Sequence, residues 1–177
     1  MTKCFTGKNQ VDLEEVLKNR DKRRNKIKKN LKNHPDKIVI SYKLNIPGPE
    51  KINESLVVLF DKGLEEIIAK INESNWNYEL AEVWEEKTGK EAILLVNGDG
   101  LKVKQTMVDL EEGSKIGRLF DIDVISKDGD ISRRDLKLEP RRCLICGGPV
   151  TICSRSRRHS VKEMQEYIEK ILEDCIK

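Results

Sequence analysis

The stretch from residue 117 to residue 124 constrains the fold more than any other part of this chain. It reads Gly-Arg-Leu-Phe-Asp-Ile-Asp-Val, and apolar and acidic side chains alternate over its second half. A period of two residues predicts a β-strand that presents Phe120, Ile122 and Val124 to a core and Asp121 and Asp123 to the opposite face. The sequence therefore predicts a sheet that is apolar on one face and polar on the other.

The two aspartates of this strand are candidate metal ligands. Side chains two residues apart on a strand point the same way and lie roughly 6.5–7 Å apart. Their like charges must be offset by water, a basic neighbour or a divalent cation. Solvated acidic residues are also ordinary on strands, so the Asp-x-Asp spacing alone leaves both interpretations open. The arginine-rich sequence downstream favours a cation that binds phosphate.

The patterns on the N-terminal side of this strand predict an α+β domain. A strand is expected over residues 37–46, followed by an amphipathic helix that Asn53 caps and that runs to Ile71. Strands are expected over residues 76–86 and 92–96, and a helix over residues 103–111. The order is β-α-β-β-α-β, which predicts a ferredoxin-like sheet over residues 37–125. Both helices are expected to cover the same face, which leaves the aspartate face uncovered.

The two ends of the chain add to this unit, and 177 residues are most simply one domain. Residues 1–35 predict a basic helix with a short apolar stripe of Leu13, Val16 and Leu17. Residues 126–177 predict a turn at 126–130, loops rich in arginine and cysteine, and a final helix that begins at a capping box formed by Ser160 and Glu163. The expected fold is thus a sheet with an N-terminal helix and a C-terminal extension ending in a helix.

Charge is distributed unevenly, although the net charge is only +3. Nine lysines and arginines fall between Lys18 and Lys32, and a second basic cluster runs from Arg133 to Arg158. Acidic residues dominate between Glu79 and Glu91. Basic zones beside an acidic one suit a polyphosphate ligand with magnesium, or an acidic protein partner.

No apolar run approaches the ~20 residues that span a bilayer, and the first residues do not resemble a signal peptide. We therefore expect a cytoplasmic protein without a membrane partner. The five cysteines are an odd number, and three of them are clustered. In a cytoplasmic chain this pattern indicates thiols or metal ligands rather than disulfides.

The clustered cysteines supply a possible zinc site. Cys143, Cys146, Cys153 and His159 offer four ligands for a tetrahedral ion. The Cys-x₂-Cys pair is typical of zinc sites, but the remaining spacing matches no standard finger, and three reduced thiols remain the alternative. A bound zinc ion is expected to act as a structural clip for the arginine-rich loops.

Four segments together resemble the apo-citrate lyase phosphoribosyl-dephospho-coenzyme A transferase family: Gly117–Val124, Ile131–Leu136, Pro140–Cys146 and Cys153–His159. The resemblance runs over most of the chain, including Arg20-Asp21 with Arg23 and Ile46–Pro49, and is weakest in the N-terminal helix. The Arg-Arg-Cys-x-x-Cys and Cys-x-Arg elements make it specific in combination.

This resemblance implies a single transferase domain over residues 1–177. The donor would be 2′-(5″-triphosphoribosyl)-3′-dephospho-coenzyme A, and the acceptor a serine of the apo-acyl carrier subunit of citrate lyase, with pyrophosphate released. A second similarity, to hydroxymethyl-dihydropterin pyrophosphokinase, lies in the order acidic helix, Gly-Arg, Asp-x-Asp strand, turn and Pro-Arg. That family has a ferredoxin-like fold, and its paired aspartates hold two magnesium ions on a triphosphate. This likeness is an analogy of fold.

The implied reaction is displacement at the α-phosphorus of a triphosphate, which depends on positioning and electrostatics. Asp121 and Asp123 are the candidate Mg²⁺ ligands. His159 is a candidate general base or phosphate ligand, and either aspartate could also take the serine proton. Guanidinium groups match phosphate bidentately, and five arginines are candidates for this role: Arg118, Arg133, Arg134, Arg141 and Arg142.

Two alternatives remain at this level. One is another Mg²⁺-dependent nucleotidyl or pyrophosphoryl transferase on the same scaffold. The other is a basic nucleic-acid-binding module, argued from Lys18–Lys32, the arginine-rich loops and a possible zinc knuckle. Only 5% of the residues are aromatic, so platforms for base stacking are scarce. A nucleic acid is therefore the less favoured partner. The sequence does not locate a coenzyme pocket.

Overall fold

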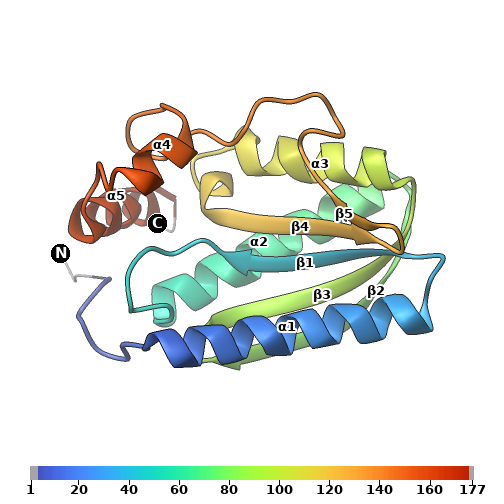
Figure 1. Cartoon of the computed structure of the whole chain (residues 1–177), viewed down its shortest axis with the longest axis horizontal. Helices are drawn as coiled ribbons and strands as arrows, with labels where there is room; N and C mark the ends of the chain where they lie inside the picture. Colours follow the sequence, from blue (N-terminus) through green and yellow to red (C-terminus); the bar gives the residue numbers. More distant parts are fainter. Residues whose placement is uncertain (1–3, 176–177) are drawn as a thin grey trace.

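The protein is built on a five-stranded antiparallel sheet flanked by helices, an α+β fold (Figure 1). The structure is a computed structural model that describes residues 4–175. The strands lie in the order β2-β3-β1-β4-β5, and each neighbouring pair is antiparallel. Their bounds are β1 Ile38–Leu44, β2 Asn77–Glu86, β3 Gly89–Asn97, β4 Phe120–Ser126 and β5 Gly129–Ile131.

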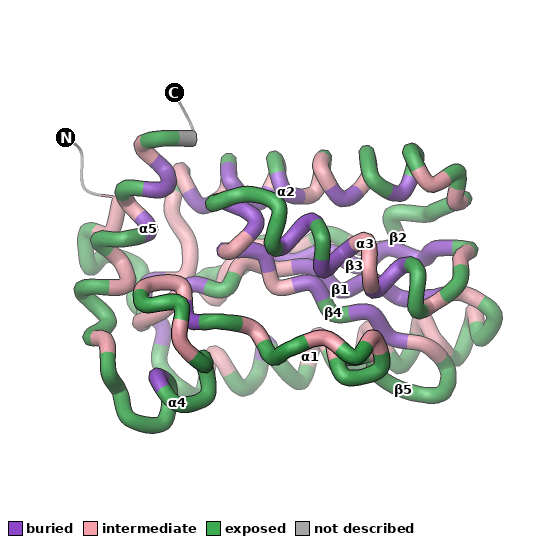
Figure 2. Tube along the Cα trace, turned by 90° about the horizontal axis from the view of Figure 1, so that it is seen from above, coloured by how far each residue is buried: buried purple, intermediate pink, exposed green. Residues whose placement is uncertain are grey.

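Helices α2 (Glu54–Glu73) and α3 (Gly100–Gly113) cover one face of the sheet and enclose the main core. Phe120, Ile122 and Val124 belong to this core and are at most 1% exposed, which confirms the predicted alternation. Tyr42 of β1 stacks on Phe60 at 4.7 Å between ring centroids and meets Phe120 edge-on at 5.6 Å. Figure 2 shows the buried stretches concentrated in the strands and in the inner sides of these helices.

Side-chain caps fix where these two helices begin. The Asn53 side chain accepts a hydrogen bond from the Leu56 N–H at 3.1 Å, so the predicted start of α2 is confirmed. Asp99 caps α3 in the same way through the Lys102 N–H. The strand expected over residues 76–86 is present as β2, with an irregular register between Leu80 and Glu82.

The opposite face of the sheet is not uncovered as expected, because α1 (Leu13–Asn33) packs on it. Its ion pairs reach β2 and β3, and its apolar side chains reach β1, β3 and the far end of β4 at Ile125. The predicted apolar stripe of α1 was also wrong, since Leu13 and Leu17 are 72% and 46% exposed. Ile27 and Leu31 pack instead against a small second core of Val39, Ile93, Leu95 and Ile125.

The C-terminal residues contain more regular structure than the sequence predicted. The turn expected at 126–130 is the tight connection of a β4–β5 hairpin, and Gly129 adopts a φ of 125° there. A short helix, α4 (Val150–Arg155), occupies part of the expected loops. The capping box of Ser160 and Glu163 is confirmed at the start of α5 (Val161–Cys175). Among the described residues, no helix is long and apolar enough to cross a bilayer.

Residues 117–119 form a short 3₁₀ turn rather than the beginning of the strand, so β4 starts at Phe120. The α5 residues Ile168, Ile171 and Leu172 are buried in the main core. Helices α4 and α5 therefore sit at the end of the sheet where β1 ends and β4 begins (Figure 1). This arrangement brings the C-terminal loops to the same end as the Asp-x-Asp strand.

Gly63 is required by packing in the middle of α2. A Cβ atom at this position would lie 2.8 Å from the ring of Phe120 and would also clash with the Tyr42 hydroxyl. We expect Gly63→Ala to lower the free energy of unfolding by about 1–3 kcal/mol, although alanine favours a helix by up to about 1 kcal/mol. Urea denaturation measures the difference.

The matched control is Gly113→Ala at the end of α3, where a Cβ would meet no atom within 4 Å. This variant should be as stable as the wild type or slightly more stable. Equal stability of the two variants would show that the space at Gly63 is not tight.

Candidate active site

The two aspartates of β4 lie side by side with a lysine on the face opposite the main core. In the register between β1 and β4, Lys43 is opposite Asp121 and Ser41 is opposite Asp123. The Lys43 ammonium donates to an Asp121 carboxylate oxygen. Asp121 is partly buried and Asp123 is exposed. The predicted direction of both carboxylates is confirmed, and a basic neighbour already offsets part of their repulsion.

The surroundings shift the two carboxyl pKa values in opposite directions. Partial burial raises the pKa of Asp121, but the charge and hydrogen bond of Lys43, with Arg141 and Arg23, lower it overall. Desolvation by the surrounding protein and the charge of Asp121 raise the pKa of Asp123, even though that side chain reaches solvent. Opposite shifts of neighbouring carboxyls separate their roles. Asp121 is held ionised, and Asp123 is the better proton acceptor.

A buried carboxylate joins α1 to this end of the sheet. Glu91 of β3 is 2% exposed and accepts two hydrogen bonds from the Arg23 guanidinium, at 2.9 and 3.0 Å. Asn19 donates a third at 2.6 Å. Glu91 is opposite Lys43 in the register of β1 and β3, so Arg23 lies close enough to act on the pKa of both aspartates.

Sequence reasoning did not assign Lys43 or Glu91 to the site. The available signal was the alternation within the first strand, where Ser41 and Lys43 are out of phase with Ile40 and Tyr42. Placing Lys43 beside the aspartates also requires knowing that β1 is the neighbour of β4. Arg23 was named individually only because of the family resemblance.

Two side chains of α3 hold the free edge of β4. β5 pairs only with residues 124–126, so the edge of β4 near Ile122 has no neighbouring strand. The Ile122 N–H donates to Glu111 Oε1 at 3.0 Å, and the Lys104 ammonium donates to the Ile122 carbonyl at 3.1 Å. Both side chains are buried. Because Ile122 stands between the two aspartates, these bonds fix the strand that carries them.

A cavity of about 470 Å³ opens beyond the end of β1 and the start of β4. Arg118, Arg141 and Arg142 line it, together with Arg157 and part of the cysteine–histidine cluster. The structure therefore brings three of the five candidate arginines together. The sequence did not locate a coenzyme pocket, and this cavity is a candidate for it. No sequence pattern indicated the cavity, because the residues that line it come from segments far apart in the chain.

Arg141 connects the cavity to the aspartate strand. Its guanidinium donates to the carbonyl oxygens of Arg118, at 2.5 Å, and Phe120, at 2.8 Å. The Arg118 guanidinium in turn donates to the Arg142 carbonyl at 2.6 Å. Partial burial and the charge of Arg141 lower the pKa of Arg118. A bound phosphate would relieve this crowding of positive charge.

The other two candidate arginines lie outside the cavity lining. Arg133 forms ion pairs with Glu111, at 3.1 Å, and Glu112, at 2.5 Å. These pairs hold Glu111, the residue that supports the edge of β4, so Arg133 contributes to the frame of the site. Arg134 is exposed and lines neither the cavity nor the aspartate face.

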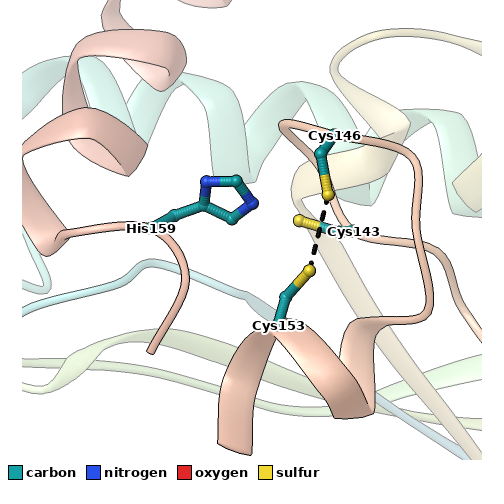
Figure 3. A group of neighbouring side chains, drawn as sticks. All are labelled: Cys143, Cys146, Cys153 and His159. Carbon is teal, nitrogen blue, oxygen red and sulfur yellow. Dashed lines mark hydrogen bonds between the residues drawn. The ribbon is translucent and has the colours of Figure 1, made fainter. Parts of the chain in front are cut away.

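The three clustered cysteines and His159 converge on the cavity wall, and Figure 3 shows the imidazole facing the sulfur atoms. The Cys146 and Cys153 Sγ atoms are 3.4 Å apart, and the cysteines are free. Interactions with the Gly148 N–H and with His159 lower the pKa of Cys146 to about 6. The pKa of Cys153 is raised to about 11 by the hydrogen bond between Cys153 and Cys146.

The sequence of this chain matches one enzyme family over most of its length. Residues 11–175 match the apo-citrate lyase phosphoribosyl-dephospho-CoA transferase family. The chain belongs to this family. The resemblance inferred from the four segments is thereby confirmed, and the match includes both the aspartate strand and the cysteine–histidine cluster.

Curated relatives agree with this assignment. The apo-citrate lyase phosphoribosyl-dephospho-CoA transferase of Escherichia coli O1:K1 is 32% identical over 171 residues, which cover 96% of this chain and 93% of the relative. A protein of Vibrio cholerae serotype O1 (strain M66-2), named as a probable transferase of this type, is 34% identical over 166 residues and 93% of each chain. The similarity therefore extends over nearly whole chains.

The ion pair of Lys43 and Asp121 generates a prediction about ionisation. Lys43→Met removes the charge and hydrogen bond that lower the pKa of Asp121 while leaving its partial burial. We expect this pKa to rise above the model-compound value of about 3.9, as measured by NMR titration of the carboxyl carbon. In the wild type, the lowered pKa of Asp121 stabilises the folded protein at pH values above the pKa of Asp121 in the unfolded state. This stabilisation is lost as the pH falls through the folded-state pKa. The variant should not show this loss.

Lys37→Met is the matched control, because Lys37 pairs with Glu79 on another part of the sheet. It should leave the Asp121 titration unchanged. An unshifted Asp121 in Lys43→Met would contradict the assigned pairing.

Proposed function

We propose that this chain transfers the phosphoribosyl-dephospho-coenzyme A group from 2′-(5″-triphosphoribosyl)-3′-dephospho-coenzyme A to a serine of the apo-acyl carrier subunit of citrate lyase. Pyrophosphate is the leaving group. Membership of the transferase family supports the reaction. The structural observation that carries the proposal is the double hydrogen bond by which Arg141, a residue of the cavity wall, is anchored to the start of the aspartate strand.

We also infer that β1 to β4 with α2 and α3 form a ferredoxin-like unit. The element order β1-α2-β2-β3-α3-β4 and the strand order β2-β3-β1-β4 support this inference. The helix α1 and residues 126–177 are then additions to that unit. One addition supplies Arg23 to the aspartate face, and the other supplies most of the cavity wall.

The cavity is the proposed donor site. Its volume of about 470 Å³ lies within the usual range of about 300–1,000 Å³ for small-molecule sites. Arg118 and Arg142 at its wall carry the positive charge that a triphosphate requires, and Arg141 holds the backbone between them and β4. The phosphates would lie at this end and point toward Asp121.

Asp121 and Asp123 suit a Mg²⁺ ion by their chemistry. Magnesium takes one or two carboxylates together with phosphate oxygens and water, and one of these carboxylates is held ionised while the other is open to solvent. Mg²⁺ held there would neutralise charge on the triphosphate oxygens. Lys43, beside Asp121, adds a second positive charge at the same place.

The residues of the chain then account for the proton and the leaving group. Asp123, whose pKa is raised, accepts the proton of the carrier serine while the serine Oγ attacks the α-phosphorus. The bond between that phosphorus and the oxygen bridging to pyrophosphate breaks. The arginines of the cavity stabilise the negative charge that the departing pyrophosphate carries away.

Replacing either carboxylate should stop transfer without unfolding the protein. We expect Asp121→Asn and Asp123→Asn each to lower the transfer rate at least ~100-fold, because one loses a fixed negative charge and the other a proton acceptor. Incubation with apo-carrier, donor and Mg²⁺, followed by mass spectrometry of the carrier, measures the product. Circular dichroism checks the fold.

Asp128→Asn, in the exposed turn between β4 and β5, is the control and should retain full activity. Near-normal transfer by either active-site variant would refute the assigned role. The carrier mass also separates this reaction from a different nucleotidyl or pyrophosphoryl transfer, since the added group would have another mass.

Arginines inside and outside the cavity should differ in their effect on donor binding. Arg142→Gln removes a charged donor from the wall, and charge-assisted hydrogen bonds contribute about 1.5–3 kcal/mol. We therefore expect a fall of about 10- to 100-fold in kcat/KM for the donor. Arg134→Gln, an identical change at an exposed position outside the lining, should have little effect. Equal losses in both variants would argue against the cavity as the donor site.

A further inference from the structure

We propose that Cys143, Cys146, Cys153 and His159 form a structural Zn²⁺ site that fixes the wall of the arginine-lined cavity. The inference stands on the geometry of these four side chains and does not depend on the reaction proposed above. In the proposed site all four side chains bind one metal ion, in place of three reduced thiols or a disulfide.

The ligand atoms are already close to the separations that zinc requires. One sulfur or nitrogen atom from each residue lies within 4.8 Å of all the others. With Zn–S distances near 2.3 Å and Zn–N distances near 2.0–2.1 Å, the ligand atoms of a tetrahedral site are about 3.5–3.8 Å apart. The Cys146 and Cys153 sulfur atoms are 3.4 Å apart. Small side-chain adjustments therefore suffice to enclose an ion.

His159 presents an unsatisfied atom to this cluster. Its Nε2 is buried and makes no hydrogen bond, although buried polar atoms in native proteins are nearly always paired. In Figure 3 the imidazole ring faces the three sulfur atoms. A metal ion among them would satisfy this nitrogen, whereas a general base would have to face the acceptor serine.

The backbone around the first two cysteines forms a tight turn that presents both sulfurs to the same point. The Gly147 N–H donates to the Cys143 carbonyl at 3.0 Å, and the Cys143 N–H donates to the Gly148 carbonyl at 2.7 Å. Gly147 has a φ of 67°, which glycine adopts without strain. Cys153 comes from α4 and His159 from the loop before α5. Three separate backbone segments thus converge on one site.

This region has almost no apolar core to hold those segments together. From residue 139 to residue 160, the buried residues are Cys143 and Cys153 alone, and Ile152 is 58% exposed. Figure 2 shows α4 and the neighbouring loops as mostly exposed. Short segments that cannot bury enough apolar surface are commonly stabilised by a metal, whose binding free energy contributes to folding. Four protein ligands also close the site, which is typical of structural zinc.

A disulfide accounts for less of this arrangement. A bond between Cys146 and Cys153 would leave Cys143 and the buried His159 nitrogen without a role. Three thiolates and one imidazole in a tetrahedral set are typical ligands for Zn²⁺. Because Arg142 directly precedes Cys143 and Arg157 lies between Cys153 and His159, an ion here would position two arginines of the cavity.

The test uses the full-length chain purified under reducing conditions. Elemental analysis should give about one zinc per chain, and replacement with Co²⁺ should produce the absorption bands of tetrahedral thiolate coordination. Cys143→Ser, Cys146→Ser and Cys153→Ser should each lower the zinc content severely. Cys4→Ser is the matched control, because Cys4 lies outside the cluster, and it should keep full occupancy.

A second measurement uses only the wild type, so it does not depend on how well the variants fold. Removal of zinc by a chelator should increase tryptic cleavage at Arg155, Arg157 and Arg158 at least several-fold, and added Zn²⁺ should reverse this increase. Wild-type protein that binds neither Zn²⁺ nor Co²⁺ would overturn the proposal. So would equal zinc content in Cys4→Ser and Cys146→Ser, or a Cys146–Cys153 disulfide found by mass spectrometry in freshly purified protein.

Discussion

The attachment of β4 at both of its edges is the constraint on which the candidate site depends. One edge pairs with β1, and the other is held at Ile122 by Glu111 and Lys104 of α3. With the apolar residues of β4 in the core, both aspartates must point to the opposite face. Two like charges held on a rigid strand repel each other, and Lys43 offsets part of that repulsion from the neighbouring strand.

Charge complementarity explains the arrangement on that face. The basic run of α1 and the acidic run of β2 and β3 meet across the sheet, through Lys22–Glu86, Lys26–Glu82 and Arg23–Glu91. A surface ion pair contributes little by itself, whereas the buried Arg23–Glu91 pair leaves an uncompensated charge if either partner is removed. These pairings turn part of the basic run toward the protein, which weakens the argument for a nucleic-acid-binding surface.

The guanidinium of Arg141 links the wall of the cavity to the sheet. Arg141 donates to two backbone carbonyls, so it connects the C-terminal loops to the start of β4, and its charge acts on Asp121 of that strand. Cys143, Cys153 and His159 of the cysteine–histidine cluster also line the cavity, in a region that buries little apolar surface. Arg141, Arg142 and Arg157 of the proposed donor site thus lie in a segment that buries little apolar surface, whereas Arg118 is held by its neighbour Leu119 in the main core.

The sequence by itself determined the local structure. The period of two in β4, the cap at Asn53 and the capping box at Ser160 each depend on residues a few positions apart, and each was predicted correctly. The Cys-x₂-Cys spacing likewise indicated a cluster before its geometry was known. Only the tertiary structure decided that α1 covers part of the polar face, that Lys43 and Glu91 belong beside the aspartates, that Gly63 admits the Tyr42 and Phe120 side chains, and that Arg134 lies apart from the other arginines. These facts depend on which strand pairs with which and on contacts between residues tens of positions apart, and no local period or motif carries that information.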